Sequence, residues 1–229
     1  MHVRWQVTFT CGNPLLHPHF KTLYRAAARL GFGIAILGNP TPCEQIRRLV
    51  DIARPLYFQI SLEGLEAHND YIRGKGHFAR SLAFLQELRA LDIYSMVMLT
   101  LTRDNLDQVL PLAERLQGLA DSFNFNRLAT VGEGAGLLMP EKDTFAAFLE
   151  DYAQAAAVNP ILGTKDNLFN LLRREKGESL CGGCTGFGCG AAFNFLWGGI
   201  VDSCAVFIFP YLLGEDFPIK AQDVPGTVG

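Results

Sequence analysis

Alternating strand-like and helix-like segments over the first 158 residues constrain the fold more than any other feature of this sequence. The strand-like segments are short and apolar or strictly alternating, and they cover residues 1–10, 34–37, 56–62, 93–102 and 123–126. The helix-like segments that follow them are longer and amphipathic, and they cover residues 18–30, 41–53, 77–91, 105–116 and 140–158. Strands that alternate with helices of 10–15 residues predict βα units, and therefore an α/β fold with a parallel sheet.

Local patterns add detail to three of these helices. The segment 18–30 is expected to bury one face, made of Leu23, Ala26, Ala27 and Leu30. Thr41-Pro-Cys-Glu44 has the form of a capping box with proline at the first helical position. Pro111 is expected to kink the helix over residues 105–116, because its ring clashes with the preceding turn.

Polar residues gather where the predicted strands end. They are Asn13, Asn39, Ser61 with Glu63, Thr102, and Asn126 with Arg127. In βα barrels and open α/β sheets, ligands bind at this edge, so a ligand site there is one interpretation. Ordinary turn chemistry is the other, since asparagine, serine and glycine favour turns anyway. Arg127 is expected either to pair with a carboxylate at this edge or to form a surface ion pair.

Four of the six cysteines lie within 24 residues, in the run Cys181-Gly-Gly-Cys184-Thr-Gly-Phe-Gly-Cys189 and at Cys204. The Cys-x2-Cys spacing lets two thiolates bind one metal, and the glycines permit the tight turns that converging ligands need. A tetrahedral zinc and an iron–sulfur cluster both fit four thiolates. Disulfides and buried free thiols are the other interpretations, but no signal peptide is visible, which disfavours an oxidising compartment.

Other isolated residues carry weaker signals. His17-Pro-His19 has the residue types of a metal pair, although this tripeptide at a helix start is more often a turn. Cys43 lies in the first helical turn, and we expect a packed thiol there.

Composition excludes some classes of function. Hydrophobic residues make up 49% of the chain and charged residues 19%, which is typical of a globular protein. The net charge of −3 predicts no nucleic-acid partner. No apolar run reaches the roughly 18–20 residues that a spanning helix needs, so we expect a cytoplasmic protein without membrane contact.

Three segments resemble radical S-adenosylmethionine (radical SAM) enzymes. The segment Val7–Pro18 resembles their second strand and its cofactor-binding turn. Gln59-Ile-Ser-Leu-Glu-Gly64, together with His68–Gly74, resembles their fourth-strand segment, and Met98–Asn105 resembles their fifth strand and the helix after it. Cys189-x9-Gly199-x4-Cys204 is similar to the start of the SPASM/twitch auxiliary-cluster region. Within the superfamily, the cysteine-rich run is most similar to that of thio(seleno)oxazole-modification maturases, which act on ribosomally made peptides.

The resemblance implies a partial (β/α)6 TIM-like barrel over residues 1–160 and a small iron–sulfur lobe over 161–229. It implies S-adenosylmethionine at Gly12, Asn13, Asn39 and Ser61, and an auxiliary [4Fe–4S] cluster at Cys181, Cys184, Cys189 and Cys204. The implied partners are a ribosomal precursor peptide as substrate and an electron-donor protein.

The sequence also departs from the family pattern. It contains no Cys-x3-Cys-x2-Cys motif, whose thiolates hold the cluster that cleaves S-adenosylmethionine, and it starts at what resembles the second strand. We therefore expect a fragment or inactive copy that lacks the first βα unit. The reconstituted chain alone is then expected to produce no 5′-deoxyadenosine. The alternative hypothesis is a non-enzymatic α/β module that uses the four cysteines to hold zinc and binds a peptide or protein partner.

Overall fold

The computed structural model describes residues 6–10, 12–130 and 132–164, together with residues 169, 173 and 177. The chain divides into two units, Met1–Thr164 and Lys165–Gly229, and nearly all of the described residues belong to the first unit. The predicted metal ligands Cys181, Cys184, Cys189 and Cys204 lie outside the described residues.

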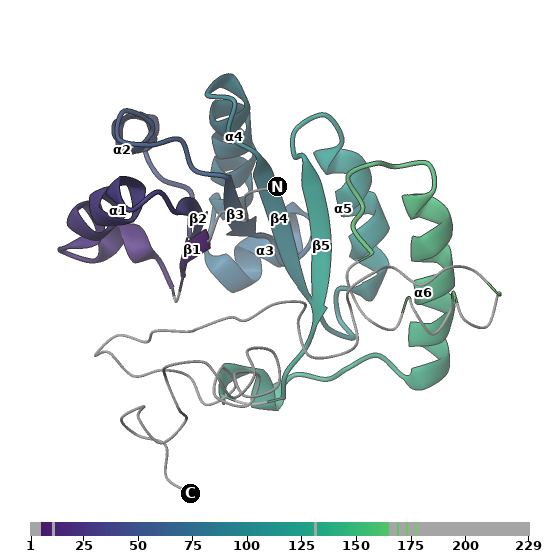
Figure 1. Cartoon of the computed structure of the whole chain (residues 1–229). Coiled ribbons are helices and arrows are strands. Elements are labelled where there is room, and N and C mark those ends of the chain that lie inside the picture. Colours follow the sequence, from purple (N-terminus) through teal and green to yellow (C-terminus); the bar gives the residue numbers. More distant parts are fainter. Residues whose placement is uncertain are drawn as a thin grey trace, which may run out of the picture. The chain divides into compact units, whose positions relative to one another are not determined.

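Five strands form one parallel sheet in the order in which they occur along the chain (Figure 1). They are β1 (Gln6–Phe9), β2 (Gly33–Leu37), β3 (Tyr57–Ser61), β4 (Ser95–Leu101) and β5 (Ser122–Arg127). Beyond β5, Leu162 forms a further parallel bridge with Phe123. The prediction of an α/β fold with a parallel sheet is confirmed.

The helices connect successive strands. They are α1 (Phe20–Arg29), α2 (Cys43–Val50), α3 (Glu66–Arg73), α4 (His77–Ala90), α5 (Val109–Leu116) and α6 (Lys142–Ala156). Three short 3-10 helices are η1 (Pro14–Leu16), η2 (Leu106–Gln108) and η3 (Gly132–Gly136). In Figure 1, α1 and α2 lie at the β1 end of the sheet, and α5 and α6 lie at the β5 end.

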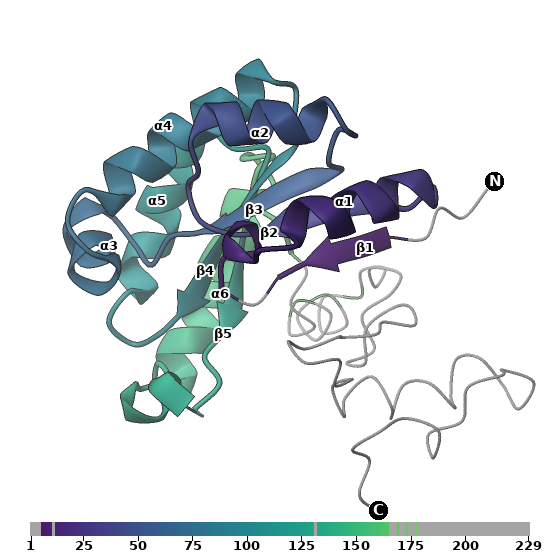
Figure 2. The ribbon, with the colours of Figure 1, turned by 90° about the vertical axis from the view of Figure 1, so that its left-hand side faces the viewer.

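Because every crossover moves one strand along in the same direction and crossovers are right-handed, the helices collect on one face of the sheet. Ring contacts identify this face. The ring centroids of Phe9 in β1 and Phe20 in α1 are 5.2 Å apart, and those of Phe58 in β3 and Phe84 in α4 are 5.0 Å apart. Figure 2 shows α1, α2 and α4 on this same side.

The hydrophobic core lies between the helices and the face of the sheet that they cover. Phe58, Val97, Leu99 and Phe123 are all fully buried there. Phe125 of β5 lies on the same face, because its ring centroid is 5.1 Å from that of Tyr152 in α6. Among the described residues, no helix is both long enough and apolar enough to cross a membrane.

The predicted buried face of α1 is wrong except at Ala27. Phe20, Tyr24 and Ala27 are buried, whereas Leu23 and Leu30 are exposed to 48% and 75%. The aromatic pair packs on Phe9 and takes the inward position, which turns the two leucines outward.

Two other local predictions are also wrong. No capping box forms at α2, because the Thr41 hydroxyl donates to the carbonyl oxygen of Asn39 (3.0 Å) and makes no bond to the helix. Pro111 does not kink a long helix. A 3-10 turn precedes it and α5 begins at Val109, so Pro111 stands in the first turn, where its missing N–H costs nothing. Helix α3 was not predicted from the sequence.

Candidate functional site

The four predicted cofactor residues lie at the carboxyl ends of three adjacent strands. Gly12 and Asn13 follow β1, Asn39 follows β2, and Ser61 is the last residue of β3. Because parallel strands end at one edge of a sheet, the fold brings these residues to the same edge. We call it the carboxyl edge.

The turn after β1 leaves backbone open at this edge. Gly12 has a φ of +78°, which glycine adopts readily, and a Cβ added there would meet no atom within 4 Å. Asn13 caps η1, since its side-chain oxygen accepts from Leu15 N (3.3 Å). A Cβ on Gly38 would lie 3.3 Å from that same oxygen, so Gly38 is needed for close packing of the two turns.

The helix-free face of the sheet carries polar side chains on β1, β3 and β5, whereas β2 and most of β4 contribute apolar residues. Strand register and alternation assign to it the residues that alternate with Phe9, Phe58 and Phe125. They are Gln6 and Thr8 of β1, Gly33, Ala35 and Leu37 of β2, Tyr57, Gln59 and Ser61 of β3, Met96, Met98 and Thr100 of β4, and Ser122, Asn124 and Asn126 of β5. Gln6 and Tyr57 meet across this face, where the Gln6 amide donates to the Tyr57 hydroxyl (3.2 Å).

This polarity is unusual for a parallel sheet, which normally has both faces covered and apolar. The face offers amide and hydroxyl groups without a charged side chain. It therefore suits a polar ligand or peptide that exchanges hydrogen bonds with it, and Ser61 stands where this face reaches the carboxyl edge.

A buried polar cluster fixes the ends of β3 and β4, and we call it the edge network. Its members are Glu63, Asn69, Asp70, Arg73, His77 and Asn105. Glu63 accepts from Arg73 through Nε (2.9 Å) and Nη2, and its backbone N–H donates to Asn69 (3.1 Å). Glu63 and Arg73 side chains are 11% and 27% exposed, so this ion pair is largely shielded from water.

Asn105 joins the two strand ends directly. It is 1% exposed, and its side-chain oxygen accepts from the backbone N–H of Thr102 (2.8 Å). Its amide nitrogen donates to the carbonyl oxygens of Glu63 and Thr100, each at 2.9 Å. One side chain thus satisfies three backbone groups from two loops.

Hydrogen bonds determine the protonation state of His77. Asn69 accepts from Glu63 N with its oxygen, so its amide nitrogen faces His77 Nδ1 at 3.1 Å. Nδ1 is therefore the acceptor and the ring proton is on Nε2. Burial lowers the pKa of His77, with further contributions from the nearby Arg73 and Arg80 charges, which agrees with a neutral ring.

Asp70 binds the start of α4. Its carboxylate accepts from the backbone N–H groups of Phe78 (2.8 Å) and Gly76. The bond from Phe78 is the main cause that holds the pKa of Asp70 below its ordinary value. A carboxylate at a helix start is also favoured by the helix dipole.

The remaining predicted residues lie apart from this cluster. Arg127 is the exposed last residue of β5, and Cys43 is a half-buried free thiol in the first turn of α2. His17 Nδ1 accepts from the His19 backbone N–H (3.0 Å), which confirms a turn at this tripeptide. Among the described residues, no three His, Cys, Asp or Glu side chains could hold a metal ion.

The edge network was not predicted from the sequence as a unit, although its member Glu63 was singled out as a strand-end residue. A signal was present in the spacing. Asn69 and Arg73 stand four residues apart, so they share one helix face, directly after the strand that ends near Glu63. Asn105 carried no such signal, because its partner Glu63 lies 42 residues away.

Comparison with known proteins adds matches to a family, to a curated relative and to solved structures. Residues 3–116 match the family model of the Radical SAM superfamily. Mycofactocin maturase MftC of Mycobacterium ulcerans (strain Agy99) is 28% identical over 180 residues, which cover 75% of this chain and 47% of that protein. The chain thus spans about half the length of this curated relative.

The fold resembles that of Streptococcus suis SuiB. The structure of SuiB bound to S-adenosylmethionine aligns with a TM-score of 0.55 and 16% identity, covering 66% of this chain and 36% of that chain. The structure of SuiB bound to precursor peptide SuiA gives a TM-score of 0.56 and 16% identity, with coverage of 74% and 40%. At this identity the likeness establishes the shared fold, a partial TIM-like α/β architecture.

Proposed function

Because the chain belongs to the radical SAM superfamily through residues 3–116, we propose that its carboxyl edge binds S-adenosylmethionine and its polar face receives a peptide substrate. The observation that carries this proposal is the helix-free face, which presents polar side chains from β1, β3, β4 and β5 beside an edge with open backbone at Gly12. The proposed function is that of a maturase-like protein for post-translational modification of a ribosomally made precursor peptide. Because the chain contains no Cys-x3-Cys-x2-Cys motif, we expect it to be inactive on its own.

The residues at the edge fit the chemistry of S-adenosylmethionine, which carries an amine, a carboxylate and ribose hydroxyls. Gly12 offers accessible backbone after β1, with the half-buried Asn13 next to it, and Asn39 offers an exposed amide after β2. Ser61 offers a hydroxyl at the end of β3. In this proposal these four residues hold the cofactor. Its reductive cleavage would need a further cluster, and the chain has no Cys-x3-Cys-x2-Cys motif to hold one.

The edge network has a supporting role. Asn105 and the Glu63–Arg73 pair hold the ends of β3 and β4 in place, so Ser61 keeps a fixed position on the edge. Preorganised polar groups bind a ligand without the cost of ordering them.

Cys181, Cys184, Cys189 and Cys204 are the proposed ligands of an auxiliary [4Fe–4S] cluster, which four thiolates can hold. Support comes from the spacing and from the superfamily assignment. Anaerobic reconstitution with iron and sulfide is expected to give broad absorbance near roughly 400 nm and about four irons per chain. Stoichiometric zinc in protein isolated without added metal, with no stable cluster, would favour the zinc module.

Calorimetric titration with S-adenosylmethionine tests the edge. We expect saturable binding, and Ser61→Ala is expected to weaken it by about 2- to 10-fold, the value of one hydrogen bond. Ser122→Ala is the matched control, because Ser122 lies on the same face at the opposite end of the sheet. Equal losses in the two variants, or no binding to the unaltered chain, would refute the proposed cofactor site.

The peptide substrate is supported by the names of two similar proteins, a mycofactocin maturase and a SuiB structure that contains precursor peptide SuiA. The proposal carries that substrate class to this chain. The donor of the reducing electron is proposed to be a separate protein.

A further inference from the structure

Charge is unevenly distributed along the chain. Residues 1–43 contain four of the 20 Lys and Arg residues and none of the 23 Asp and Glu residues, which begin at Glu44. This segment therefore has a net charge of +4, whereas the rest of the chain has −7. Such asymmetry points to an anionic partner for the basic segment.

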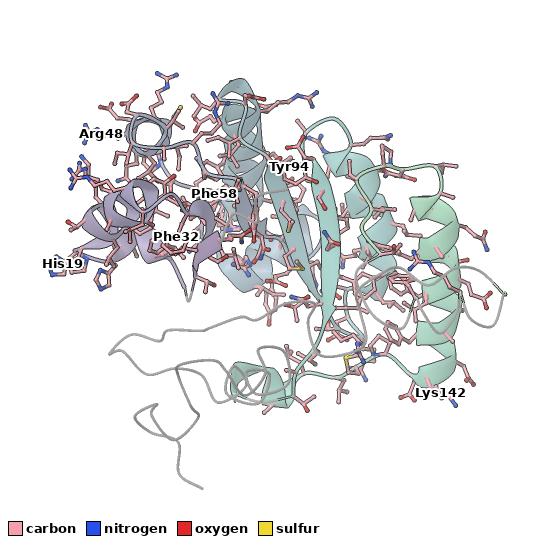
Figure 3. The ribbon with its side chains drawn as sticks, in the orientation of Figure 1. His19, Phe32, Arg48, Phe58, Tyr94 and Lys142 are labelled. Atoms are coloured by element: carbon pink, nitrogen blue, oxygen red, sulfur yellow. The ribbon has the colours of Figure 1, made fainter. Side chains whose placement is uncertain are left out.

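Three of the four cations lie on one side of α1. Lys21, Arg25 and Arg29 follow one another at four-residue spacing, so neighbouring side chains lie about 6 Å apart on one helix face. All three are exposed. We call them the α1 basic row. Figure 3 shows side-chain nitrogens gathered around α1 and α2, where His19 and Arg48 are labelled.

The basic row has no acidic counterpart on its own helix. Within the described part of the chain, no ion pair joins these three side chains to a carboxylate. The neighbouring helix is built differently, since Arg48 of α2 pairs with Glu44 at the same four-residue spacing (2.8 Å). Like charges four residues apart destabilise an isolated helix, so α1 carries a cost that a bound anion would remove.

Two exposed apolar side chains lie on the other side of α1. Leu23 and Leu30 are exposed because Phe20 and Tyr24 occupy the inner face of the helix. At 3.6 residues per turn, both leucines stand roughly 100° or more around the helix from each cation of the row, so they are not part of the same surface. The row itself offers three cations, which suits a peptide with a few carboxylates better than a nucleic-acid backbone, which offers phosphates at high density.

The geometry of the row matches an extended chain. From Lys21 to Arg29 the helix rises about 12 Å, at 1.5 Å per residue. In an extended peptide, alternate side chains lie about 6.6 Å apart on one side, close to the spacing of the three cations. Acidic residues at three alternate positions would thus each meet one cation.

Position links the row to the carboxyl edge. α1 follows β1 through Gly12, Asn13 and η1, so its first turn lies beside the edge and the row runs away from it. β1 is the outermost described strand on that side of the sheet. A peptide with one part at the edge can therefore continue along α1.

We propose that the α1 basic row binds an acidic segment of the peptide substrate, with acidic residues at alternate positions, while the segment to be modified lies at the carboxyl edge. This inference rests on the proposed function, in which the substrate is a peptide. Each exposed ion pair contributes little, so the row sets register and salt-sensitive affinity more than tight binding.

Fluorescence anisotropy with the full chain tests the proposal. The probe is a labelled 11-residue peptide with glutamate at three alternate positions among serine, alanine and one leucine, and its control has glutamine at those positions. We expect the glutamate peptide to bind about tenfold tighter at 25 mM salt and to lose that advantage at 300 mM, because exposed charges are screened.

Two triple variants separate the row from overall charge. Lys21→Gln, Arg25→Gln and Arg29→Gln together are expected to reduce binding of the glutamate peptide about tenfold, since three ion pairs are lost. The control replaces three exposed cations elsewhere, Lys75→Gln, Arg115→Gln and Lys142→Gln, and should stay within about twofold.

Equal losses in the two triple variants would overturn the proposal, as would no detectable binding of the glutamate peptide. Tighter binding to phosphatidylglycerol vesicles or to a short DNA duplex would instead assign the row to a membrane or a nucleic acid and also overturn it. The assay contains neither S-adenosylmethionine nor a cluster. If the glutamate peptide does not bind but S-adenosylmethionine does, only the proposal for the α1 basic row is refuted. If the peptide binds but S-adenosylmethionine does not, only the proposed cofactor site is refuted.

Discussion

Asn105→Ala is expected to destabilise the protein strongly. The substitution removes three hydrogen bonds, one from Thr102 N and one each to the carbonyl oxygens of Glu63 and Thr100. At about 0.5–1.5 kcal/mol for each bond, the loss is about 3 kcal/mol. Asn105 makes no side-chain capping bond to η2, so helix capping adds nothing to this cost.

Urea unfolding followed by far-UV circular dichroism measures the effect. With a slope of about 2 kcal/mol per molar, the midpoint should fall by about 1.5 M at unchanged slope. Hydrogen exchange provides a local readout, in which the amide of Thr102 should exchange at least about tenfold faster in the variant.

Asn126→Ala is the matched control, because Asn126 stands near the same edge but is exposed. Surface substitutions of this kind usually stay within about 0.5 kcal/mol. If Asn105→Ala also stays within that range, the edge network does not hold the strand ends, and these hydrogen bonds do not account for the rigidity of the carboxyl edge.

Three further predictions concern the same region. Arg73→Leu leaves the Glu63 carboxylate without its cation and should lower the free energy of unfolding by about 2 kcal/mol. Glu63→Gln keeps a hydrogen-bond acceptor and should lower it by about 1 kcal/mol. Urea midpoints in the reverse order would contradict the role assigned to the ion pair. Because the pKa of His77 is lower in the folded chain than in the unfolded chain, the unfolded chain binds a proton at this ring first as pH falls. The contribution of neutral His77 to the free energy of unfolding is therefore fully present above about pH 6.5 and is lost as pH falls toward the folded pKa. His77→Gln should therefore reduce the difference in urea midpoint between pH 7.5 and pH 5.5, and an unchanged difference would exclude His77 as its source. Gly64→Ala should destabilise the protein more than Gly31→Ala. Both glycines have positive φ, but only a Cβ on Gly64 would meet another side chain, at 2.5 Å from Gln108 Oε1. Similar melting temperatures for the two variants would show that Gln108 moves aside freely.

Much of the fold could be predicted from local patterns. Alternation of strand and helix periods is a property of short segments, so five strands and most helices were found without knowledge of their packing. The polar residues Asn13, Asn39 and Ser61 were found for the same reason, because each lies at the end of a predicted strand. Parallel order then places them at one edge.

Predictions failed where two sets of side chains compete for one position. The sequence of α1 offers leucines and aromatic residues for the buried face, and contact between Phe9 and the pair Phe20 and Tyr24 decides between them. Residue types alone do not rank these options. The outcome matters, because it leaves Leu23 and Leu30 exposed on the surface of α1.

By itself, the sequence determined the class of fold, the charge asymmetry and the residues at the end of each strand, since all three depend on neighbours along the chain. Only the tertiary structure decided which face of the sheet is free of helices and which side chains form the edge network. Asn105 reaches Glu63 across 42 residues of chain, and no local period encodes that pairing. Such a contact exists only once β3 and β4 lie side by side, because their pairing brings the two loops within hydrogen-bonding distance.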